Sequence, residues 1–375
     1  MPGKGRAGAH VKGRVPANGP LTGVALNRAL LGRQLLLERS PAGAEEVVRR
    51  LVAVNAQQPD IAHIGLAARL KHFHPDDLDR LIRTRRVVRA TFLRTTIHLV
   101  TAADYLALRA ALQPRLDATL RNEFPELRDL DRETFTKVCG EILAKQALTR
   151  AELGRALAVR FPHYDAEALA FASTRSLPLV HLPPAGEWGS RARARYASAE
   201  AWLGQPLAPR ERAEEDLVRR YLAAFGPASV ADLSAWSGVA GLQGAVARIE
   251  KDLVTIAGAG GRTLWDVPDS FEITDDPAPL RLLPAYDNVL FGHSDRSRVV
   301  PGQYRESLSR GAAAVLAGGF VCGTWRLTRG RPGTARFEVR GAPDLAADQV
   351  QAETSAMAER LFGGEQVPVV IQPPR

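Results

Sequence analysis

Apolar residues recur at the spacing of amphipathic helices in the first third of the chain, and a β-rich stretch follows them. Residues 26–39, 61–73 and 75–82 place apolar side chains three and four positions apart, as one face of a helix requires. Residues 87–100 are rich in β-branched residues, which is typical of strands. Helices followed by a β-hairpin are the order of a winged helix. The pattern therefore predicts a first winged-helix unit over residues 21–112.

The same order recurs in the next third of the chain. Thr149 and Glu152 are spaced as a capping box, which predicts a helix that begins directly after Thr149. A strand-like stretch with turn residues follows. Beyond it, ahead of Tyr196, arginines alternate as they would on one side of a strand: Arg191, Arg193 and Arg195. These features predict a second winged-helix unit over residues 113–205, with a basic wing.

A third copy is predicted over residues 206–272. Ser229 is a typical N-cap for the helix that it precedes, and residues 241–252 have the pattern expected of a recognition helix. A Gly-rich hairpin follows. At the other end of the chain, residues 1–20 contain four basic side chains and no acid, together with many Gly, Ala and Pro. We interpret this segment as a disordered basic tail.

The last hundred residues change character. Strand-like runs dominate, and one helix is predicted over residues 343–363. Residues 281–340 contain ten arginines and four acids, a net charge of +6, so the excess positive charge of the chain is concentrated here. We expect residues 273–375 to form a β-rich domain that carries a basic hairpin.

Charge and composition narrow the classes of function. The chain carries a formal net charge of +9, which favours polyanionic partners. Its two cysteines lie far apart, which excludes a disulfide framework and suits a reducing cytoplasm. No apolar run approaches the length of a membrane span. The sequence contains no zinc, Walker or Rossmann motif, so we expect no metal and no cofactor.

Several segments, taken in order, resemble the bacterial winged-helix DNA glycosylases of the AlkZ and YcaQ superfamily. The similarity extends from residue 26 to about residue 340 and is greatest to the AlkZ-like branch. The segments that carry it are LVAVNAQQPDIAHIGLAARL (51–70), VVRATFLRTTIHLVTAADYLAL (87–108), FGPASVADLSAWSG (225–238), LLPAYDNVLFGHSDRSRV (282–299) and GTWR (323–326).

This resemblance implies an α+β fold, a C-shaped molecule of three winged helices and a small β-barrel, with duplex DNA on the concave basic face. It implies a monofunctional DNA glycosylase that hydrolyses the N-glycosidic bond of N7-alkylated purines, bulky adducts and interstrand crosslinks included. Base excision repair and self-resistance to a DNA-alkylating natural product belong to the same expectation. Its partner would be double-stranded DNA carrying alkylated purines, bound by a cytoplasmic, nucleoid-associated monomer.

The catalytic motif of the family is Gln-apolar-Gln or Gln-apolar-Asp, and it falls on Asn55-Ala56-Gln57. Gln57 matches the third position, whereas Asn55 is one methylene shorter than the family residue. Amides can suffice because an N7-alkylated purine is already a good leaving group, and the transition state is oxocarbenium-like. The enzyme then needs to orient a water and stabilise charge, and an amide oxygen can accept a hydrogen bond from that water. We therefore expect Asn55 and Gln57 to be catalytic.

Backbone conformation decides whether the two amides can act together. Residues two apart point to opposite sides of a helix but share a side in extended backbone. Pro59 disfavours helix at Gln58, so an unwound segment would let both amides face one cleft. Alternatively, Asn55 and Gln57 form only a polar helix end. Asp60 is a further candidate carboxylate, although such a residue more often caps the next helix.

Two stretches are candidates for DNA contact. The predicted first wing carries Arg94, Thr95, Thr96 and His98, and the arginines that precede them could contact phosphates or form a solvated helix face. A predicted basic hairpin between strand-like runs carries a second set: His293, Arg296 and Arg298. A solvated β-turn is the alternative for this second stretch.

Two other functions remain open. Asn55 in place of the family glutamine also fits a non-catalytic winged-helix DNA-binding protein or transcriptional regulator. An RNA-binding winged-helix protein is a third hypothesis, although no RNA-type motif supports it.

Overall fold

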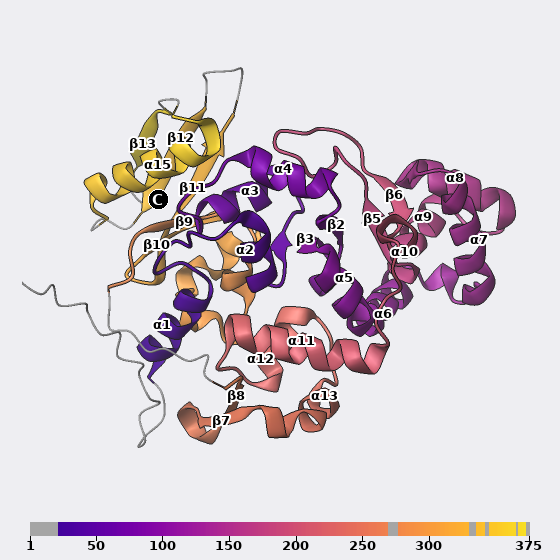
Figure 1. Cartoon of the computed structure of the whole chain (residues 1–375), viewed down its shortest axis with the longest axis horizontal. Coiled ribbons are helices and arrows are strands. Elements are labelled where there is room, and N and C mark those ends of the chain that lie inside the picture. Colours follow the sequence, from indigo (N-terminus) through magenta and orange to yellow (C-terminus); the bar gives the residue numbers. More distant parts are fainter. Residues whose placement is uncertain (1–21, 269–276, 330–334, 342–344, 365–366, 373–375) are drawn as a thin grey trace, which may run out of the picture.

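The structure is a computed structural model that describes residues 22–268, 277–329, 335–341, 345–364 and 367–372 (Figure 1). The expected basic tail, residues 1–20, lies outside the described residues. The fold mixes helices with two larger sheets and one hairpin. No helix in the described part of the chain is long and apolar enough to cross a membrane.

The first repeat follows α1 (Gly23–Arg33) and runs in the order helix, strand, helix, helix, strand, strand. Its strands pair in the order β1-β3-β2, so the first strand lies beside the last. Its elements are α2 (Ala44–Arg50), β1 (Val54–Asn55), α3 (Pro59–Ala67), α4 (Pro75–Arg83), β2 (Val87–Thr91) and β3 (Ile97–Thr101).

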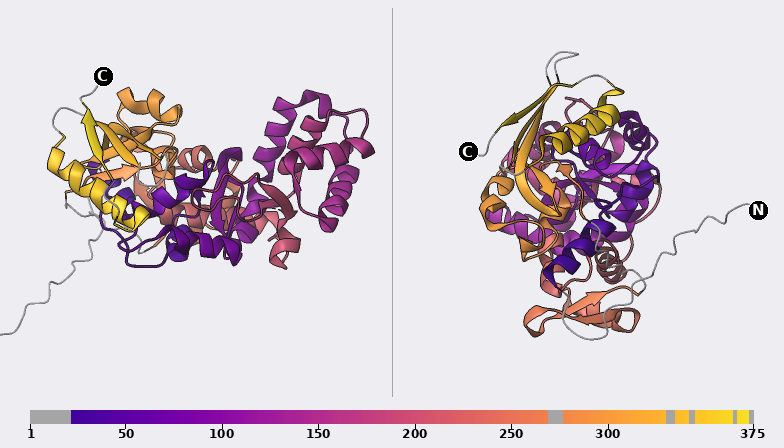
Figure 2. Two further views of the ribbon diagram at one scale, coloured as in Figure 1. Left: turned by 90° about the horizontal axis from the view of Figure 1, so that it is seen from above. Right: turned by 90° about the vertical axis from the view of Figure 1, so that its left-hand side faces the viewer.

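The second repeat has the same order of elements and the same strand order, β4-β6-β5. Two helices lead into it, α5 (Ala102–Leu108) and α6 (Gln113–Glu123). Its elements are α7 (Arg132–Lys145), β4 (Leu148–Thr149), α8 (Arg150–Arg160), α9 (Ala166–Ser176), β5 (Leu179–His181) and β6 (Arg195–Ser198). Figure 2 (left) shows its helices as a lobe at the end of the molecule away from the C-terminal elements.

The sheets of the first two repeats are one sheet. Strand β2 pairs with β5 in antiparallel register, with Arg89 opposite His181 and Ala90 opposite Val180. The result is a six-stranded sheet in the order β1-β3-β2-β5-β6-β4. All five residues of β2 are buried, because the strand is central in this sheet. The expected first wing therefore exists as a hairpin, but it is enclosed by the second repeat rather than free.

The third repeat uses a single bridge where the others have a first strand. Ala228 pairs with Trp265 of β8, and β8 pairs with β7. The bridge, β8 and β7 thus lie in the spatial order that the strands of the other two repeats follow. The helices and strands of this region are α10 (Ala199–Leu203), α11 (Arg210–Phe225), α12 (Val230–Ser237), α13 (Gln243–Arg248), β7 (Val254–Ala257) and β8 (Thr263–Asp266).

The C-terminal region forms a five-stranded sheet in the order β13-β12-β11-β10-β9, packed beside α15. Its outer strands β13 and β9 do not pair with each other among the described residues, so the sheet is open there and the expected small barrel is not seen closed. The elements are β9 (Arg281–Leu283), α14 (Arg305–Ser309), β10 (Ala313–Ala317), β11 (Phe320–Thr328), β12 (Arg336–Gly341), α15 (Ala347–Phe362) and β13 (Val369–Gln372).

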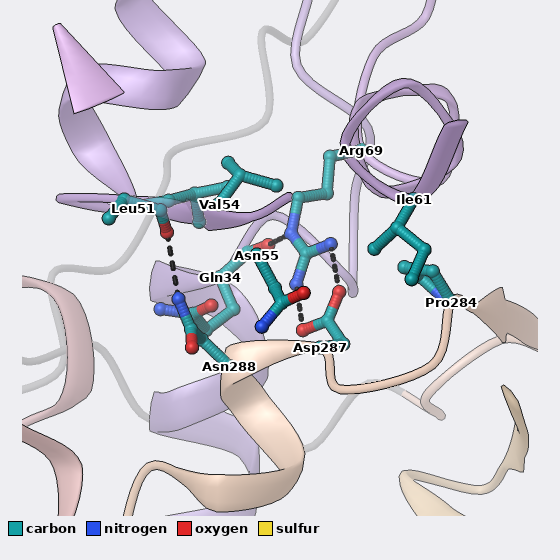
Figure 3. Close-up of a pocket in the computed structure, with 10 residues that line it drawn as sticks. Gln34, Leu51, Val54, Asn55, Ile61, Arg69, Pro284, Asp287 and Asn288 are labelled. Carbon is teal, nitrogen blue, oxygen red and sulfur yellow. Dashed lines mark hydrogen bonds and ion pairs between the residues drawn. The ribbon is translucent and has the colours of Figure 1, made fainter. Parts of the chain in front are cut away.

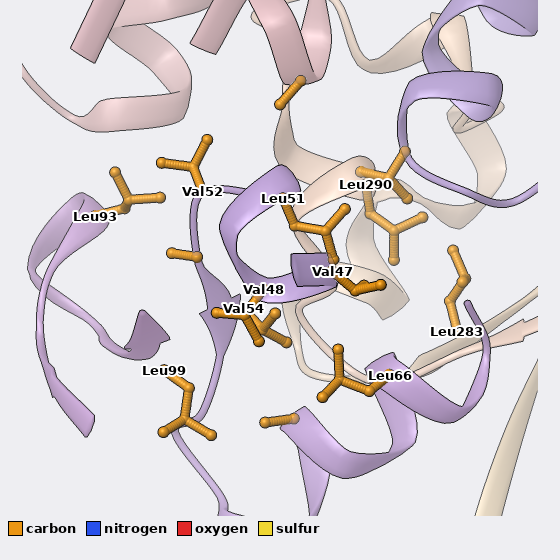
Figure 4. Packing of buried hydrophobic residues seen from close by; sticks show 14 of the residues in the cluster. Val47, Val48, Leu51, Val52, Val54, Leu66, Leu93, Leu99, Leu283 and Leu290 are labelled. Atoms are coloured by element: carbon orange, nitrogen blue, oxygen red, sulfur yellow. The ribbon is translucent and has the colours of Figure 1, made fainter. Parts of the chain in front are cut away.

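Two apolar clusters hold these parts together. The larger joins the first and third repeats to the C-terminal sheet, and Figure 4 shows Val47, Leu51 and Leu66 of the first repeat beside Leu283 and Leu290. Each such side chain stabilises the fold by about 1.5–3 kcal/mol when it leaves water. The helices of the second repeat have a separate cluster, which contains Phe135, Leu153, Leu157 and Leu169. That lobe therefore has a core of its own and joins the rest mainly through the shared sheet.

Local signals explain most element boundaries. The predicted caps Thr149 and Ser229 are confirmed, and Thr101 caps α5 in the same way, since each side chain accepts a hydrogen bond from a backbone N–H of the first helical turn. The prediction of a helix over residues 26–39 is wrong in its second half. Helix α1 ends at Arg33, and Leu35 has a φ of 58°, which breaks the helical path. Ser40 does not cap the next helix, because α2 begins only after Gly43.

Candidate functional site

Asn55 lies in extended backbone at the centre of the candidate site. Helix α2 ends at Arg50, Val52 adopts a φ of 68°, and the chain then enters β1. Strand β1 pairs with β3, which places Asn55 opposite His98. Gln58 is extended because Pro59 begins α3 directly after it. The prediction of an unwound segment, rather than a helix end, is confirmed.

The side chain of Asn55 enters a narrow pocket of mixed polar and apolar lining between the first repeat and the C-terminal region (Figure 3). Only 4% of Asn55 is exposed. The pocket offers about 10 Å³ of space, close to the smallest volume that holds one water molecule and far too little for a purine. Its polar walls come from Gln34, Arg69, Asp287 and Asn288. The geometry suits the placement of one small molecule beside an amide.

The one carboxylate that lines this pocket is neutralised. Both oxygens of Asp287 accept hydrogen bonds from the guanidinium of Arg69, each at 2.8 Å, and both side chains are almost completely buried. Arg69 Nε also donates to the backbone oxygen of Gln34 at 3.0 Å, and Asn288 Nδ2 donates to the oxygen of Ala53 at 2.9 Å. These bonds hold the dipoles around Asn55 in place before any ligand enters.

Gln57 is placed differently from Asn55. Its side chain is exposed, and its Oε1 accepts a hydrogen bond from the backbone N–H of Ile97 at 3.0 Å. Its own backbone N–H donates to Asn55 Oδ1 at 3.2 Å. Asn55 lines the narrow pocket and Gln57 does not, so the expectation that both amides face one cleft is not met in this conformation. The two residues are instead linked through the backbone.

Asp60, the further candidate carboxylate, is already engaged. Its Oδ2 lies 2.7 Å from Arg329 Nη1, and its Oδ1 accepts a hydrogen bond from the backbone N–H of Gly189 at 2.7 Å. Arg329 in turn stacks over the ring of Trp188 at 4.1 Å. Asp60 thus connects α3 to the end of β11, which leaves it poorly placed to act as a base beside Asn55.

The turn between β2 and β3 carries Arg94, Thr95 and Thr96. Arg94 and Thr95 have φ values of 51° and 61°, an uncommon left-handed conformation for residues with a Cβ. The Arg94 guanidinium donates to the backbone oxygen of Trp236 at 2.5 Å and to Asn288 Oδ1 at 2.9 Å. Burial lowers the pKa of Arg94 to about 10, so the side chain remains a cation. Thr95 and Thr96 are half-buried at this turn.

His98 is fully buried and is not accessible to DNA in this structure. Its Nδ1 lies 3.2 Å from the backbone oxygen of Thr96. Burial, reinforced by the charge of Arg94, lowers the pKa of His98 to about 3. The imidazole is therefore neutral at physiological pH and braces the β3 side of the site.

The stretch that contains His293, Arg296 and Arg298 is not a β-hairpin, which corrects the expectation from the sequence. It forms two 3-10 turns, Asn288–Phe291 and Arg296–Arg298. The cause is local. The carboxylates of Asp287 and Asp295 cap these turns by accepting hydrogen bonds from Val289 N and Ser297 N, each at 3.0 Å. Such side-chain bonds to the backbone compete with strand formation.

These three basic residues are largely committed to the protein interior. His293 is 5% exposed, and its Nε2 lies 3.0 Å from Phe225 O and 2.8 Å from Arg298 Nη1. Burial lowers the pKa of His293 to about 3. Arg298 also donates to the backbone oxygen of Pro227 at 2.9 Å. Arg296 is half-buried and lies over the ring of Phe291 at 4.3 Å.

Comparison with known proteins decides the family. A family model described as DNA glycosylase AlkZ-like matches residues 48–361. The chain belongs to the AlkZ-like DNA glycosylase family. A curated relative from Streptomyces sahachiroi, named interstrand DNA cross-link repair glycosylase, is 26% identical over 362 residues, with 85% of this chain and 93% of the relative covered. The solved structure of Streptomyces sahachiroi DNA glycosylase AlkZ superposes with a TM-score of 0.79 at 21% identity and covers 94% of this chain and 100% of that one.

Sequence reasoning missed several residues of the site in this AlkZ-like glycosylase. Arg69, Asn288 and Gln34 line the pocket of Asn55, and none of them was predicted to do so. A signal existed for two of them. Arg69 is a charged residue within the apolar run IAHIGLAARL, and Asn288 follows Asp287 within the apolar run LLPAYDNVLF. Charged and amide side chains in apolar runs must find partners when they are buried.

The arginines before the first wing are mostly paired with acids in this AlkZ-like glycosylase. Arg80 pairs with Asp77, Arg83 with Glu187, and Arg86 with Glu45. These ion pairs are on the surface and lower the charge that the segment offers to DNA. Among the described residues, no group of three or more His, Cys, Asp or Glu side chains could hold a metal ion.

Proposed function

We propose that this member of the AlkZ-like DNA glycosylase family hydrolyses the N-glycosidic bond of N7-alkylated purines in duplex DNA, bulky adducts and interstrand crosslinks included. Family membership supports the glycosylase activity, and the name of the relative from Streptomyces sahachiroi supports interstrand crosslinks as substrates. The observation that carries the proposal is the Asn55 pocket, a water-sized space to which Asn55, Gln34 and Asn288 contribute amides and whose one carboxylate is paired with Arg69.

The chemistry follows from the substrate. An N7-alkylated purine carries a formal positive charge, so its departure needs little protonation. The sugar gains positive charge in the transition state, as in other glycoside hydrolysis. Asn55 Oδ1 has two lone pairs, and the backbone N–H of Gln57 occupies only one of them. The second can accept a hydrogen bond from the attacking water, and fixed dipoles around the pocket favour the charge that develops.

Gln57 has a second role in the proposal. Its exposed carboxamide joins the end of the motif to Ile97. In the proposal, the sugar approaches the motif from this exposed side. Its oxygen has a lone pair beyond the bond to Ile97 N, so it can stabilise positive charge on the sugar. We therefore retain Asn55 and Gln57 as the catalytic pair, acting from different sides of the reacting bond.

The repeats support a DNA-binding architecture. In all three repeats, the strand that comes last in the chain lies in space between the other two, with the single bridge of the third repeat counted as its first strand. This is the arrangement of a winged helix. We interpret them as three winged-helix units, and the open C-terminal sheet as the counterpart of the small barrel. In Figure 2 (left) the second-repeat lobe and the C-terminal elements rise on the same side of the central body, in keeping with a C shape. Duplex DNA would lie between them, bound by a monomer.

The proposed DNA contacts differ in kind. The turn of Arg94, Thr95 and Thr96 is half-buried, and its two hydroxyls donate to the backbone oxygens of Arg94 and Leu93. Contact with a phosphate therefore requires these side chains to turn outward when DNA binds. Arg296 and Arg298 can add charge at the edge of the third repeat. His98 and His293 are buried, and they contribute by bracing these segments. A nucleoid-associated role in self-resistance to a DNA-alkylating natural product completes the proposal.

Single-turnover excision tests the function. The substrates are duplexes with one N7-alkylguanine, a simple methyl group in one and an interstrand crosslink in the other. Removing a positioning group commonly costs on the order of 10²-fold, and the lability of this substrate reduces the expected loss for Asn55→Ala or Gln57→Ala to about tenfold. The matched control is Gln58→Ala, an exposed amide whose side chain makes no capping bond.

The control and the wild-type protein separate the outcomes. Gln58→Ala should retain the wild-type rate. Equal rates for Asn55→Ala, Gln57→Ala and wild type would remove the catalytic assignment but leave the glycosylase activity. Tight duplex binding without any excision by the wild-type protein would establish the second candidate, a non-catalytic DNA-binding protein, which Asn55 in place of the family glutamine favours.

A further inference from the structure

Arg89 is a buried cation directly behind the candidate catalytic motif. It lies on β2, is 7% exposed, and has no carboxylate partner among the described residues. Its guanidinium donates instead to the backbone oxygens of the motif, from Nε to Ala56 O at 3.0 Å and from Nη2 to Gln57 O at 3.3 Å. A planar guanidinium presents these donors in a fixed fork. Arg89 therefore fixes two consecutive peptide units of the motif.

The remaining arm of the fork reaches the second repeat. Arg89 Nη1 lies 2.6 Å from His181 Nδ1, and the two residues are opposite each other where β2 pairs with β5. His181 is 4% exposed, and the ring of Tyr196 packs edge-on against it at 4.7 Å. Since the guanidinium can only donate, Nδ1 accepts, so the imidazole is neutral. Burial lowers the pKa of His181 to about 3, which agrees with this tautomer.

The motif is thus held from two sides. On one side β3 bonds to it, since Ala56 N donates to Ile97 O at 2.9 Å and Gln57 Oε1 accepts from Ile97 N. On the other side Arg89 takes the carbonyl oxygens. Gly186 passes over the stem of Arg89 with a φ of 106°, and a Cβ there would lie 2.8 Å from Arg89 Cδ. The loop after β5 is therefore shaped to cover this side chain closely.

A structural role alone does not require a cation here. A buried charge without an opposite charge is costly, whereas an apolar side chain of similar size would fill the same space at no such cost. What the guanidinium adds is a rigid three-point connection between Ala56 O, Gln57 O and the second repeat. The connection fixes the peptide planes from which the Asn55 and Gln57 side chains extend.

We propose that Arg89 is a positioning residue for the hydrolysis, and that His181 of the second repeat holds Arg89 in its working orientation. The inference rests on the proposed function, because it assigns Arg89 to the Asn55–Gln57 motif. It adds that the placement of the second repeat is transmitted to the motif through the Arg89–His181 contact. Small displacements of reacting groups carry large rate costs, which gives the contact its catalytic weight.

Two matched pairs of variants test the proposal with single-turnover excision at saturating protein. Arg89→Met keeps the aliphatic stem and removes the fork, and we expect the excision rate to fall by about tenfold or more. Affinity for the duplex should change by less than about twofold, since the buried guanidinium is not a phosphate contact. Arg89→Lys retains the charge but not the fork and should remain as slow as Arg89→Met.

The second pair separates positioning from stability. In His181→Asn, the amide oxygen occupies the place of Nδ1 and can accept from Arg89, so the rate should remain close to that of the wild type. In His181→Leu, a similar shape lacks the acceptor, and the rate should fall about as far as in Arg89→Met. Because both changes break one contact, the double variant Arg89→Met/His181→Leu should be no slower than Arg89→Met alone.

A second readout does not depend on activity. Amide hydrogen exchange of residues 54–58 in the folded protein should be faster in Arg89→Met and His181→Leu, and unchanged in His181→Asn. A wild-type rate in Arg89→Met, alongside a slow Asn55→Ala, would overturn the inference and leave the proposed function intact. If the wild-type protein excises nothing, the proposed function fails. Unchanged amide hydrogen exchange of residues 54–58 in Arg89→Met would then also overturn the inference that Arg89 fixes the motif.

Discussion

Asn55 Oδ1 and the backbone N–H of Gln57 are joined by a hydrogen bond of 3.2 Å. The bond turns the first amide of the motif into the narrow pocket and orients the peptide that leads to the second. Under the proposed function, this local bond would fix the oxygen of a residue that is one methylene shorter than the family glutamine.

The first prediction concerns the size of residue 55. Asn55→Gln adds a methylene to a pocket with about 10 Å³ of free space. Overpacking of this kind destabilises a protein by about 1–3 kcal/mol, and we expect a loss of that size in the free energy of unfolding by urea. Gln205 provides the control, since it is an exposed amide between helices and Gln205→Asn should change stability by less than about 0.5 kcal/mol. An Asn55→Gln variant as stable as wild type would show that the pocket expands freely.

The second prediction concerns the buried pair of Arg69 and Asp287. Arg69→Met leaves a buried carboxylate without its cation, which should destabilise the fold by about 3–5 kcal/mol. The double variant Arg69→Met/Asp287→Leu removes both charges and should recover much of that loss. Urea unfolding of Arg69→Met, Asp287→Leu and the double variant measures the coupling free energy between the two side chains. Additive losses would mean that the two side chains do not depend on each other.

The third prediction concerns stability in acid. Burial lowers the pKa of His98 and of His181 in the folded protein to about 3, below the ordinary value of 6.5. Below pH 6.5 the unfolded chain therefore binds protons that the folded protein does not. As the pH is lowered below 6.5, the free energy of unfolding should fall by about 1.4 kcal/mol per pH unit for each histidine. The stability that each neutral histidine contributes is fully present only above pH 6.5.

Denaturation between pH 7 and pH 4 measures this slope. His98→Asn retains a donor towards Thr96 O but cannot titrate, so the slope should become shallower. Gln303→Asn supplies the control, because it changes an exposed side chain that does not titrate, and it should leave the slope as it is. An identical slope in His98→Asn and wild type would mean that His98 is protonated in the folded protein.

The fourth prediction concerns phosphate contacts. Arg191 and Arg193 are exposed in the loop between β5 and β6, whereas Arg80 is paired with Asp77. Each lost phosphate contact lowers the slope of log K against log salt concentration by about one. We expect Arg191→Gln/Arg193→Gln to lower the slope for an undamaged duplex, and Arg80→Gln to leave it near the wild-type value. A reversed order would place the DNA on the face of α4.

The sequence predicts a structural feature when the interactions that form the feature join residues close together in the chain. The caps at Thr101, Thr149 and Ser229 and the hairpin over residues 87–100 were predictable, because each depends on side chains a few positions apart. The joining of β2 to β5 was not, because it pairs residues about ninety positions apart. The turn at Asp287 was misread as strand, since its apolar neighbours outweighed one capping carboxylate.

The site divides in the same way. Asn55 and Gln57 were found through family resemblance, and Pro59 correctly indicated extended backbone ahead of it. The partners of the motif were not found. Arg69 and Asp287 are 218 residues apart, and only the packing of the C-terminal region against the first repeat brings them together. Burial could not be foreseen either, and it is burial that changes His98 from a candidate DNA contact into an internal brace.

The shared six-stranded sheet has a consequence for how the first two repeats could bind a damaged duplex. Units joined by a linker can each turn to follow the path of the helix, whereas units joined strand to strand keep one spacing and one angle. If duplex DNA contacts both of the first two repeats, as proposed, the shared sheet would hold their contact surfaces at a fixed separation and angle. A stiff, straight duplex would then reach only some of these contact surfaces, whereas a duplex that a lesion has locally softened can bend to reach all of them. The sheet would thereby favour damaged sites before any base is read.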